Sequence, residues 1–186
     1  MCGRFTLTQS SEAIAIEFQT DLAFAVSPRY NIAPSQPILV SLKDGHTGKR
    51  HATHLVWGLL PSWAKDPAMG RRMINARAET VAEKPSFRTA FRRRRCLIPT
   101  DGFYEWHTEK SSKRSANQTS SGRNPVKQPF HIQLAPDQSS TRTHNALLAF
   151  AGIREHWQSP DGIDIYSCAV LTMPANQSML PFHHRM

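Results

Sequence analysis

The sequence lacks the features of a membrane-spanning or secreted protein. Its 186 residues contain no apolar run near the ~20 residues that a membrane-spanning helix needs. The first residues do not form a basic segment followed by an apolar one, so no secretory signal is indicated. We therefore expect a cytoplasmic protein that does not bind a membrane.

Cysteine and acidic residues are both scarce. The three cysteines, Cys2, Cys96 and Cys168, are far apart in the sequence, which predicts neither a disulfide framework nor a zinc site. We expect no metal and no cofactor. Asp and Glu number 14 against 23 Lys and Arg, a formal net charge of +9. This excess favours a polyanionic partner such as nucleic acid, but a basic surface without a special role would also explain it.

Short runs with strand character dominate the rest of the chain. They lie at residues 38–42, 96–98, 130–134, 147–153 and 167–172, and residues 102–106 are also extended. Asp44-Gly45 predicts a hairpin whose return strand ends near Val56. Ser10 is expected to cap a short helix, and residues 86–95 have helical character.

Two other segments are expected to be loops. Residues 29–34 should form a loop, and the polar stretch 108–127 should be a mobile surface loop. Many short strands with few helices predict an α+β fold. We expect one domain over residues 1–186, with a curled mixed β-sheet or barrel core and short flanking helices.

Cys2 follows the initiator methionine directly. Its side chain is small enough that removal of Met1 is expected, which would leave an α-amine and a thiol on one residue. Their ordinary pKa values are ~7.7–8.0 and ~8.5, so both are partly nucleophilic near neutral pH. Such a pair attacks an acyl carbon or condenses with an aldehyde to a thiazolidine ring. Free cysteines are more often small buried side chains, so Cys2 alone does not decide the function.

Four further side chains are candidates for proton transfer or positioning. Glu105 lies between two aromatic residues in a stretch that reads as buried, where desolvation favours the protonated form that proton transfer uses. Strand alternation would instead turn it to solvent. Asn75 lies in a polar cluster beside apolar residues. His183 and His184 are candidate acids or bases, or simply a solvated pair.

Two arginine runs lie near a segment with two tryptophans. Residues 92–95 are four consecutive arginines, Arg71 and Arg72 are adjacent, and Trp57 and Trp63 lie earlier in the segment that leads to them. Arginines take phosphates and aromatic rings stack on bases, so this combination fits single-stranded nucleic acid. Four arginines in a row cannot share one helix face, so part of the run is expected to be solvated surface.

Seven motifs occur in order along the chain. They are MCGRF (1–5), RYNIAP (29–34), WGLLPSW (57–63), NARAET (75–80), CLIP (96–99), GFYEW (102–106) and HHRM (183–186). Together they closely resemble the signatures of the SOS response-associated peptidase (SRAP) family, the abasic-site shield proteins. The resemblance runs from residue 2 to the last residue.

The resemblance implies a DNA-repair function in the DNA damage (SOS) response. The partner would be single-stranded DNA with abasic sites, and the protein would be nucleoid-associated and bacterial. Cys2 would be the nucleophile that forms a covalent thiazolidine link, after hydrolytic, protease-like removal of Met1. Asn75 would position the amine and the sugar, and Glu105 would shuttle protons. His183, rather than His184, would help to open the deoxyribose ring in this lyase-like reaction.

The same resemblance implies a set of DNA-binding residues. Arg4, Arg77 and Arg185 would clamp phosphates or sugar, Trp63 would stack on a base, and Thr172 would lie near the bound strand. Members of the family continue past the His-x-Arg-Met motif with a proline, a further strand and a helix. This chain ends at Met186, so we expect the C-terminal part of the family domain to be missing.

Two other functions stay open. A cysteine peptidase that cuts other proteins would use Cys2, His183 and Asn75. A non-covalent binder of single-stranded DNA would need only the positive charge and the tryptophans. If Met1 stays attached, the nitrogen of Cys2 is an amide and the covalent reaction does not start.

Overall fold

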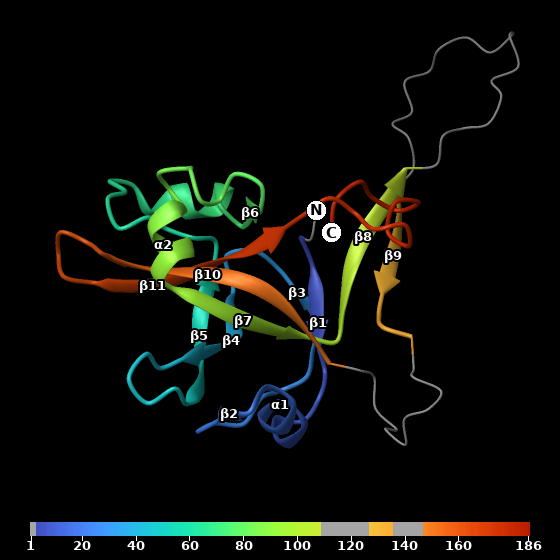
Figure 1. The fold of residues 1–186 in the computed structure, drawn as a ribbon, viewed down its shortest axis with the longest axis horizontal. Helices are drawn as coiled ribbons and strands as arrows, with labels where there is room; N and C mark the ends of the chain where they lie inside the picture. Colours follow the sequence, from blue (N-terminus) through green and yellow to red (C-terminus); the bar gives the residue numbers. More distant parts are fainter. Residues whose placement is uncertain (1–2, 109–126, 136–146) are drawn as a thin grey trace, which may run out of the picture.

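The computed structural model describes residues 3–108, 127–135 and 147–186. Cys2 and residues 109–126, nearly all of the expected mobile loop, therefore lie outside the described residues. The described chain forms two β-sheets with short helices around them (Figure 1). The expected α+β class with a barrel core is confirmed.

A seven-stranded sheet makes the centre of the fold. Its order is β2-β5-β4-β7-β10-β11-β6. The bounds are β2 (Thr20–Asp21), β4 (Pro37–Lys43), β5 (Arg50–Trp57), β6 (Asn75–Arg77), β7 (Arg95–Thr100), β10 (Leu148–Gln158) and β11 (Asp164–Thr172). Strands β5 and β11 also pair in parallel, through Ser167 with Val56 and Cys168 with Trp57. This pairing closes β5, β4, β7, β10 and β11 into a five-stranded barrel.

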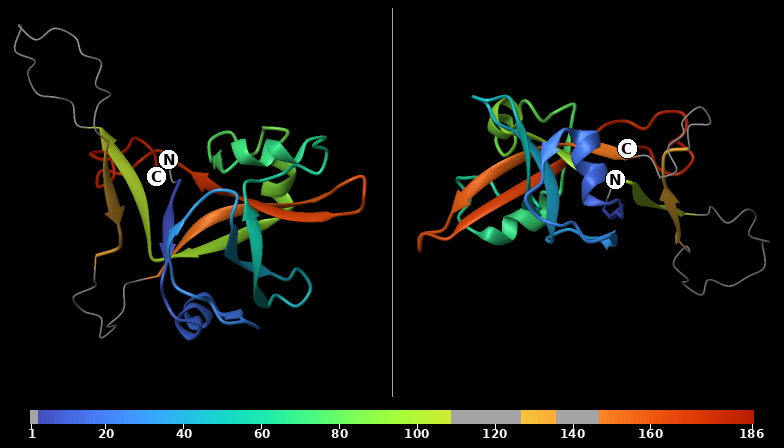
Figure 2. Two further views of the ribbon diagram at one scale, coloured as in Figure 1. Left: turned by 180° about the vertical axis from the view of Figure 1, so that it is seen from behind. Right: turned by 90° about the horizontal axis from the view of Figure 1, so that it is seen from below.

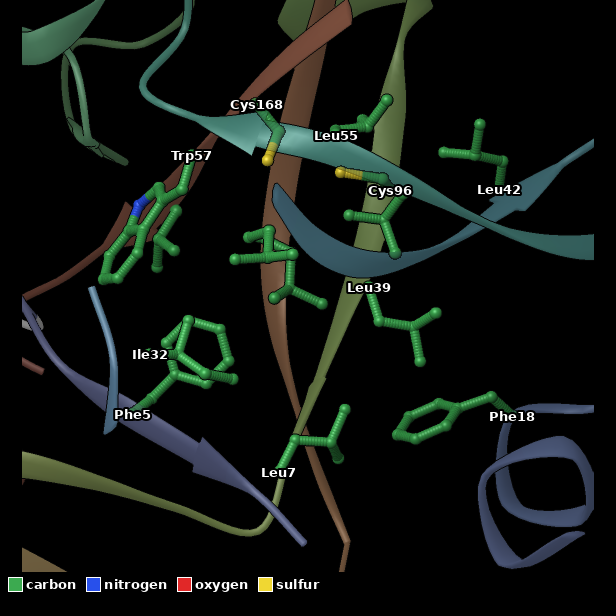
Figure 3. Close-up of a cluster of buried hydrophobic side chains, with 14 of the residues drawn as sticks. Phe5, Leu7, Phe18, Ile32, Leu39, Leu42, Leu55, Trp57, Cys96 and Cys168 are labelled. Carbon is green, nitrogen blue, oxygen red and sulfur yellow. The ribbon is translucent and has the colours of Figure 1, made fainter. Parts of the chain in front are cut away.

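The barrel is filled with apolar side chains. Ile38, Val40, Trp57 and Ile98 are completely buried, and the close-up in Figure 3 shows Trp57 beside Phe5 and Ile32. The run Ile38–Leu42 is buried at every position, because β4 has other elements packed on both of its faces. Burial of these side chains is the main favourable term for the fold.

A four-stranded sheet stands against the barrel in the order β3-β1-β8-β9. Its strands are β1 (Phe5–Leu7), β3 (Arg29–Ile32), β8 (Gly102–Thr108) and β9 (Lys127–Ile132). Between β7 and β8 only Asp101 intervenes, so the chain passes from the barrel into this sheet at one residue. In Figure 1, β8 runs upward and β9 downward on the right, beside the barrel.

Asp101 ties β1 to this crossing point. Its carboxylate is buried and accepts hydrogen bonds from the hydroxyls of Thr6 and Thr8 and from the backbone N–H of Thr8. The Thr100 hydroxyl donates to the Thr6 carbonyl at 2.9 Å. The position of the first strand therefore depends on a polar network as well as on apolar packing.

Three short helical segments complete the fold: α1 (Ser11–Phe18), the 3-10 helix η1 (Pro67–Arg72) and α2 (Arg88–Arg93). The predicted cap is confirmed, because the Ser10 hydroxyl accepts the backbone N–H of Ala13 at 3.2 Å. Helix α1 buries Ile14 and Phe18 against the barrel core. No helix in the described part of the chain is both long and apolar enough to cross a membrane.

The predicted strands are confirmed, with ends that shift by a few residues. The expectation of a loop over residues 29–34 is wrong, because Arg29–Ile32 forms β3 and pairs with β1. Strands β1 and β6 were not predicted. These three strands are only three or four residues long, and their pairing partners lie far along the chain, so local patterns do not reveal them.

Candidate functional site

Strand β6 places Asn75 beside the end of β11. The two strands pair in parallel, with Asn75 opposite Val170 and Arg77 opposite Thr172. The carbonyl of Ile74 accepts two hydrogen bonds, from the backbone N–H of Val170 at 3.0 Å and from the Trp57 indole at 2.9 Å. The residue before Asn75 is thus fixed to two strands of the barrel, and Asn75 itself is half-buried.

The C-terminal segment, residues 173–186, turns back on the end of β11. Met173 and Met186 exchange two backbone hydrogen bonds, of 2.9 and 3.0 Å, next to a bridge between Pro174 and Arg185. The Arg185 guanidinium donates to the carbonyl of Thr172 at 2.7 Å and to the two carboxylate oxygens of Glu79 at 3.1 and 3.0 Å. The segment is therefore attached both to β11 and to the loop that follows β6.

His183 is held within this segment. Its ring is half-buried, and its Nδ1 lies 3.0 Å from the backbone nitrogen of Arg185. When that N–H donates to Nδ1, the neutral ring carries its proton on Nε2. The ring of exposed His184 stacks on His183 with centroids 4.3 Å apart. His183 is the less exposed of the two histidines, and its role as the functional one stays a prediction.

Glu105 lies on the neighbouring sheet. The expected burial is confirmed, since its side chain is 3% exposed. It pairs with Phe130 across β8 and β9, and the Phe130 ring contacts that of Phe182 with centroids 5.0 Å apart. Phe182 directly precedes His183. The predicted proton shuttle and the predicted histidine are therefore connected through two aromatic rings.

The beginning of the described chain runs along β8. The backbone N–H of Tyr104 donates to the carbonyl of Arg4 at 2.9 Å, and Phe5 pairs with Phe103. One more step in this antiparallel register puts Gly3 opposite Glu105. In both figures of the whole fold, the start of β1, the end of β11 and the C-terminal segment lie close together (Figures 1 and 2). Cys2 is outside the described residues, but the residue that follows it, Gly3, lies at this place.

The predicted DNA-binding arginines have different surroundings. Arg77 is exposed, whereas the Arg185 side chain is 11% exposed and hydrogen-bonds to Glu79 and Thr172. The Arg4 guanidinium donates to Asn31 Oδ1 at 2.9 Å. Thr172 is 1% exposed, and its hydroxyl faces Arg185. A direct contact between Thr172 and DNA stays a prediction.

Trp63 comes from a separate excursion, residues 58–74, between β5 and β6. The next residue, Ala64, is buried and accepts a hydrogen bond of 2.7 Å from the Trp157 indole. At the base of the excursion Gly58 has φ 138°, and a Cβ there would meet the Gly70 carbonyl at 2.7 Å. These contacts fix the excursion and leave Trp63 55% exposed, as base stacking requires.

The arginine run divides as expected. Arg92, Arg93 and Arg95 are exposed, whereas Arg94 donates to the buried carboxylate of Glu155 at 2.7 Å. Arg71 and Arg72 are exposed at the end of η1. Positive charge is therefore available on the surface near the excursion, while Arg94 has a structural partner.

Two of the three cysteines are buried inside the barrel. Figure 3 shows Cys96 and Cys168 among the apolar side chains of the core. Burial raises the pKa of the Cys96 thiol to about 12 and the pKa of the Cys168 thiol well above its ordinary value. Because the thiolate is the nucleophile, neither residue is a candidate for covalent catalysis. Among the described residues, no three His, Cys, Asp or Glu side chains come together as a metal site.

Sequence reasoning missed Glu79 and Asp101. Glu79 lies inside the motif 75–80, and its hydrogen bonds from Arg185 lower its pKa below the ordinary value. The two residues are 106 positions apart, so no local pattern indicates the pair. Asp101 follows a strand and precedes a glycine, which reads as an ordinary turn.

Comparison with known proteins identifies the family. The family model described as SOS response associated peptidase (SRAP) matches residues 1–186. The chain belongs to the SRAP family. The resemblance seen in the seven motifs is thereby confirmed.

Named relatives of the SRAP chain occur in bacteria and vertebrates. The chain is 41% identical over 189 residues to "Abasic site processing protein YoaM" of Bacillus subtilis, covering 100% of this chain and 73% of the relative. It is 42% identical over 189 residues to YoqW of the same species, covering 74% of that relative. It is 32% identical to HMCES of Xenopus tropicalis over 179 residues, with 86% of this chain and 49% of the relative covered.

Solved structures show the same fold. A protein from Bacteroides thetaiotaomicron superposes on all of this chain and 75% of its own, with a TM-score of 0.78 at 19% identity. A protein from Bordetella bronchiseptica covers 100% of this chain and 82% of its own, with a TM-score of 0.72 at 22% identity. At these identities the likeness concerns the fold alone.

Proposed function

We propose that this SRAP chain binds single-stranded DNA and traps abasic sites covalently through Cys2. Its relatives are named abasic site processing proteins, and its net charge is +9. The observation that carries the proposal is a convergence. The elements with Asn75, Glu105 and His183 meet beside the beginning of β1, the strand that Cys2 precedes.

The proposed reaction is a condensation with the aldehyde of a ring-opened abasic sugar. The α-amine of Cys2 adds to C1′, and the loss of one water gives an imine. The thiol sulfur then bonds to the imine carbon, and its proton ends on the nitrogen, which closes a thiazolidine. The sum of the two steps joins protein and DNA and releases only water.

Each neighbouring residue has a task in this sequence. Glu105, kept from water at 3% exposure, takes and returns the protons of the adding amine and the departing water. His183 assists the opening of the deoxyribose ring at its hydroxyl. Asn75 orients the amine and the sugar by hydrogen bonds. Exposed Arg77 attracts a phosphate, and Trp63 stacks on an unpaired base.

The reaction requires removal of Met1. Hydrolysis of the Met1–Cys2 peptide bond, by an aminopeptidase or by the chain itself, turns an unreactive amide nitrogen into an amine. The peptidase in the family description fits a single self-cleavage of this kind. Multiple turnover on other proteins is not needed.

The test uses a single-stranded oligonucleotide with one abasic site, made from a uracil-containing strand. Intact mass spectrometry first reports whether Met1 is removed. We expect a heat-stable adduct with the combined mass of the processed protein and the DNA, minus one water. Cys2→Ala should abolish it. A strand with a tetrahydrofuran site, which has no aldehyde, should give no adduct with the unmodified chain.

Four outcomes would contradict the proposal. Cys2→Ala could cross-link as fast as the unmodified chain, or the chain could keep Met1 and form no adduct. Cys2-dependent cleavage of a peptide in trans would favour a cysteine peptidase. Equal affinity for intact and abasic strands without an adduct would favour the second candidate, a non-covalent binder, which exposed Trp63 and the exposed arginines support.

A further inference from the structure

We infer that Glu79 is a positioning residue, which holds Arg185 and through it the segment that carries His183. The inference rests on the proposed function, in which His183 acts on the sugar. Glu79 follows β6, and Arg185 lies two residues after His183. One ion pair therefore links the element that carries Asn75 to the element that carries His183.

The contact has the geometry of a fixed attachment. Two guanidinium nitrogens of Arg185 donate to the two oxygens of Glu79, at 3.1 and 3.0 Å. Such a fork sets the direction of the guanidinium as well as its distance. The nitrogen nearer Glu79 Oε2 also donates to the Thr172 carbonyl at 2.7 Å. The Arg185 side chain is 11% exposed, so it has little room for other orientations.

The effect on His183 passes through the backbone of Arg185. Its N–H lies 3.0 Å from His183 Nδ1 and its carbonyl 3.1 Å from the same atom. A change in the position of Arg185 changes both contacts, on which the orientation and the tautomer of the His183 ring depend. Glu79 thus acts on the histidine without touching it.

The negative charge of Glu79 makes it possible to distinguish a positioning role from a role in DNA binding. Arg77 also lies near Glu79 and lowers its pKa, so the carboxylate sits between two arginines that are predicted to bind DNA. Neutralising Glu79 removes a negative charge that repels phosphate. A substitution that weakens the reaction and leaves DNA binding unchanged or tighter therefore cannot be explained by a lost DNA contact.

The experiment measures single-turnover adduct formation against the concentration of abasic DNA. For Glu79→Gln we expect a maximal rate lower by about 10-fold or more, because small misplacements of reacting groups have effects of this size. The half-saturating DNA concentration should stay equal or fall. Glu79→Asp should recover part of the rate. Glu83→Gln, which neutralises an exposed glutamate four residues later, is the matched control and should behave as the unmodified chain.

Amide hydrogen exchange gives a readout that does not depend on the reaction. In Glu79→Gln the amides of Arg185 and Met186 should exchange faster, and in Glu83→Gln they should not. Unchanged exchange in Glu79→Gln, or a maximal rate within twofold of the control, would overturn the inference. A raised half-saturating concentration with an unchanged maximal rate would also overturn it. If the unmodified chain forms no adduct, the proposed function fails, and hydrogen exchange still decides the positioning role.

Discussion

The barrel and the region around the candidate site are stabilised in different ways. The barrel core is a cluster of buried apolar side chains, in which burial also raises the pKa of both thiols. The elements that carry the candidate site have polar attachments: Asp101 holds β1 at its boundary with the barrel, and Glu79 holds Arg185. The barrel supplies general stability, while polar contacts with defined directions place the elements that carry the candidate residues. Substitutions should therefore separate stability from the placement of the site.

The largest effect should follow a substitution in the barrel. Trp57→Ala removes a fully buried ring that packs on Phe5 at 5.2 Å between centroids and donates to the Ile74 carbonyl. We expect the free energy of unfolding to fall by about 3–5 kcal/mol, as for other large buried side chains. Urea denaturation measures it. Trp57→Phe keeps a ring and should lose less; an equal loss would mean that packing is not the main contribution.

A smaller effect should follow a substitution at the boundary of the two regions. Asp101→Ala leaves the hydroxyls of Thr6 and Thr8 and one backbone N–H without their buried acceptor. We expect a loss of about 2–3 kcal/mol. Hydrogen exchange should show faster exchange in β1 and unchanged protection in β4. Equal loss of protection in both strands would contradict the separation of the two regions.

The smallest effect is a pH dependence that belongs to the barrel. Burial raises the pKa of the Cys96 thiol from 9.0 to about 12, so above pH 9 the unfolded chain releases a proton that the folded chain retains. The contribution of this thiol to the free energy of unfolding is fully present below pH 9. It is lost as the pH rises towards 12, by roughly 1.4 kcal/mol per pH unit at most. Between pH 8 and 10 the midpoint temperature of thermal unfolding should fall less steeply for Cys96→Ala than for the unmodified chain. Equal slopes would refute the buried thiol's contribution.

The sequence predicted the barrel strands and part of the site. Strands such as Pro37–Lys43 and Leu148–Gln158 are long enough for their apolar pattern to be read locally. The aromatic neighbours of Glu105 indicated burial and strand alternation indicated exposure, and the structure shows that it is buried. These features depend on residues that are adjacent in the chain.

The features that sequence reasoning missed depend on distant pairs. Strand β3 pairs with β1, β6 pairs with β11, and Glu79 meets Arg185 across 106 positions. A three-residue strand has too few positions to show alternation, and an exposed glutamate in a loop looks like any solvated charge. The resemblance to the family identified the motifs, but the contacts between them required the structure.

The four tryptophans are divided evenly between two environments, which gives the protein an internal optical probe. Trp57 and Trp157 are 0% and 5% exposed, whereas Trp63 and Trp106 are 55% and 40% exposed. A water-soluble quencher should therefore quench the emission of Trp63 and Trp106 and leave the blue-shifted emission of Trp57 and Trp157. A nucleobase stacked on an indole would quench only the emission of the exposed tryptophans. Titration with unlabelled oligonucleotides can thus follow strand binding without any added dye.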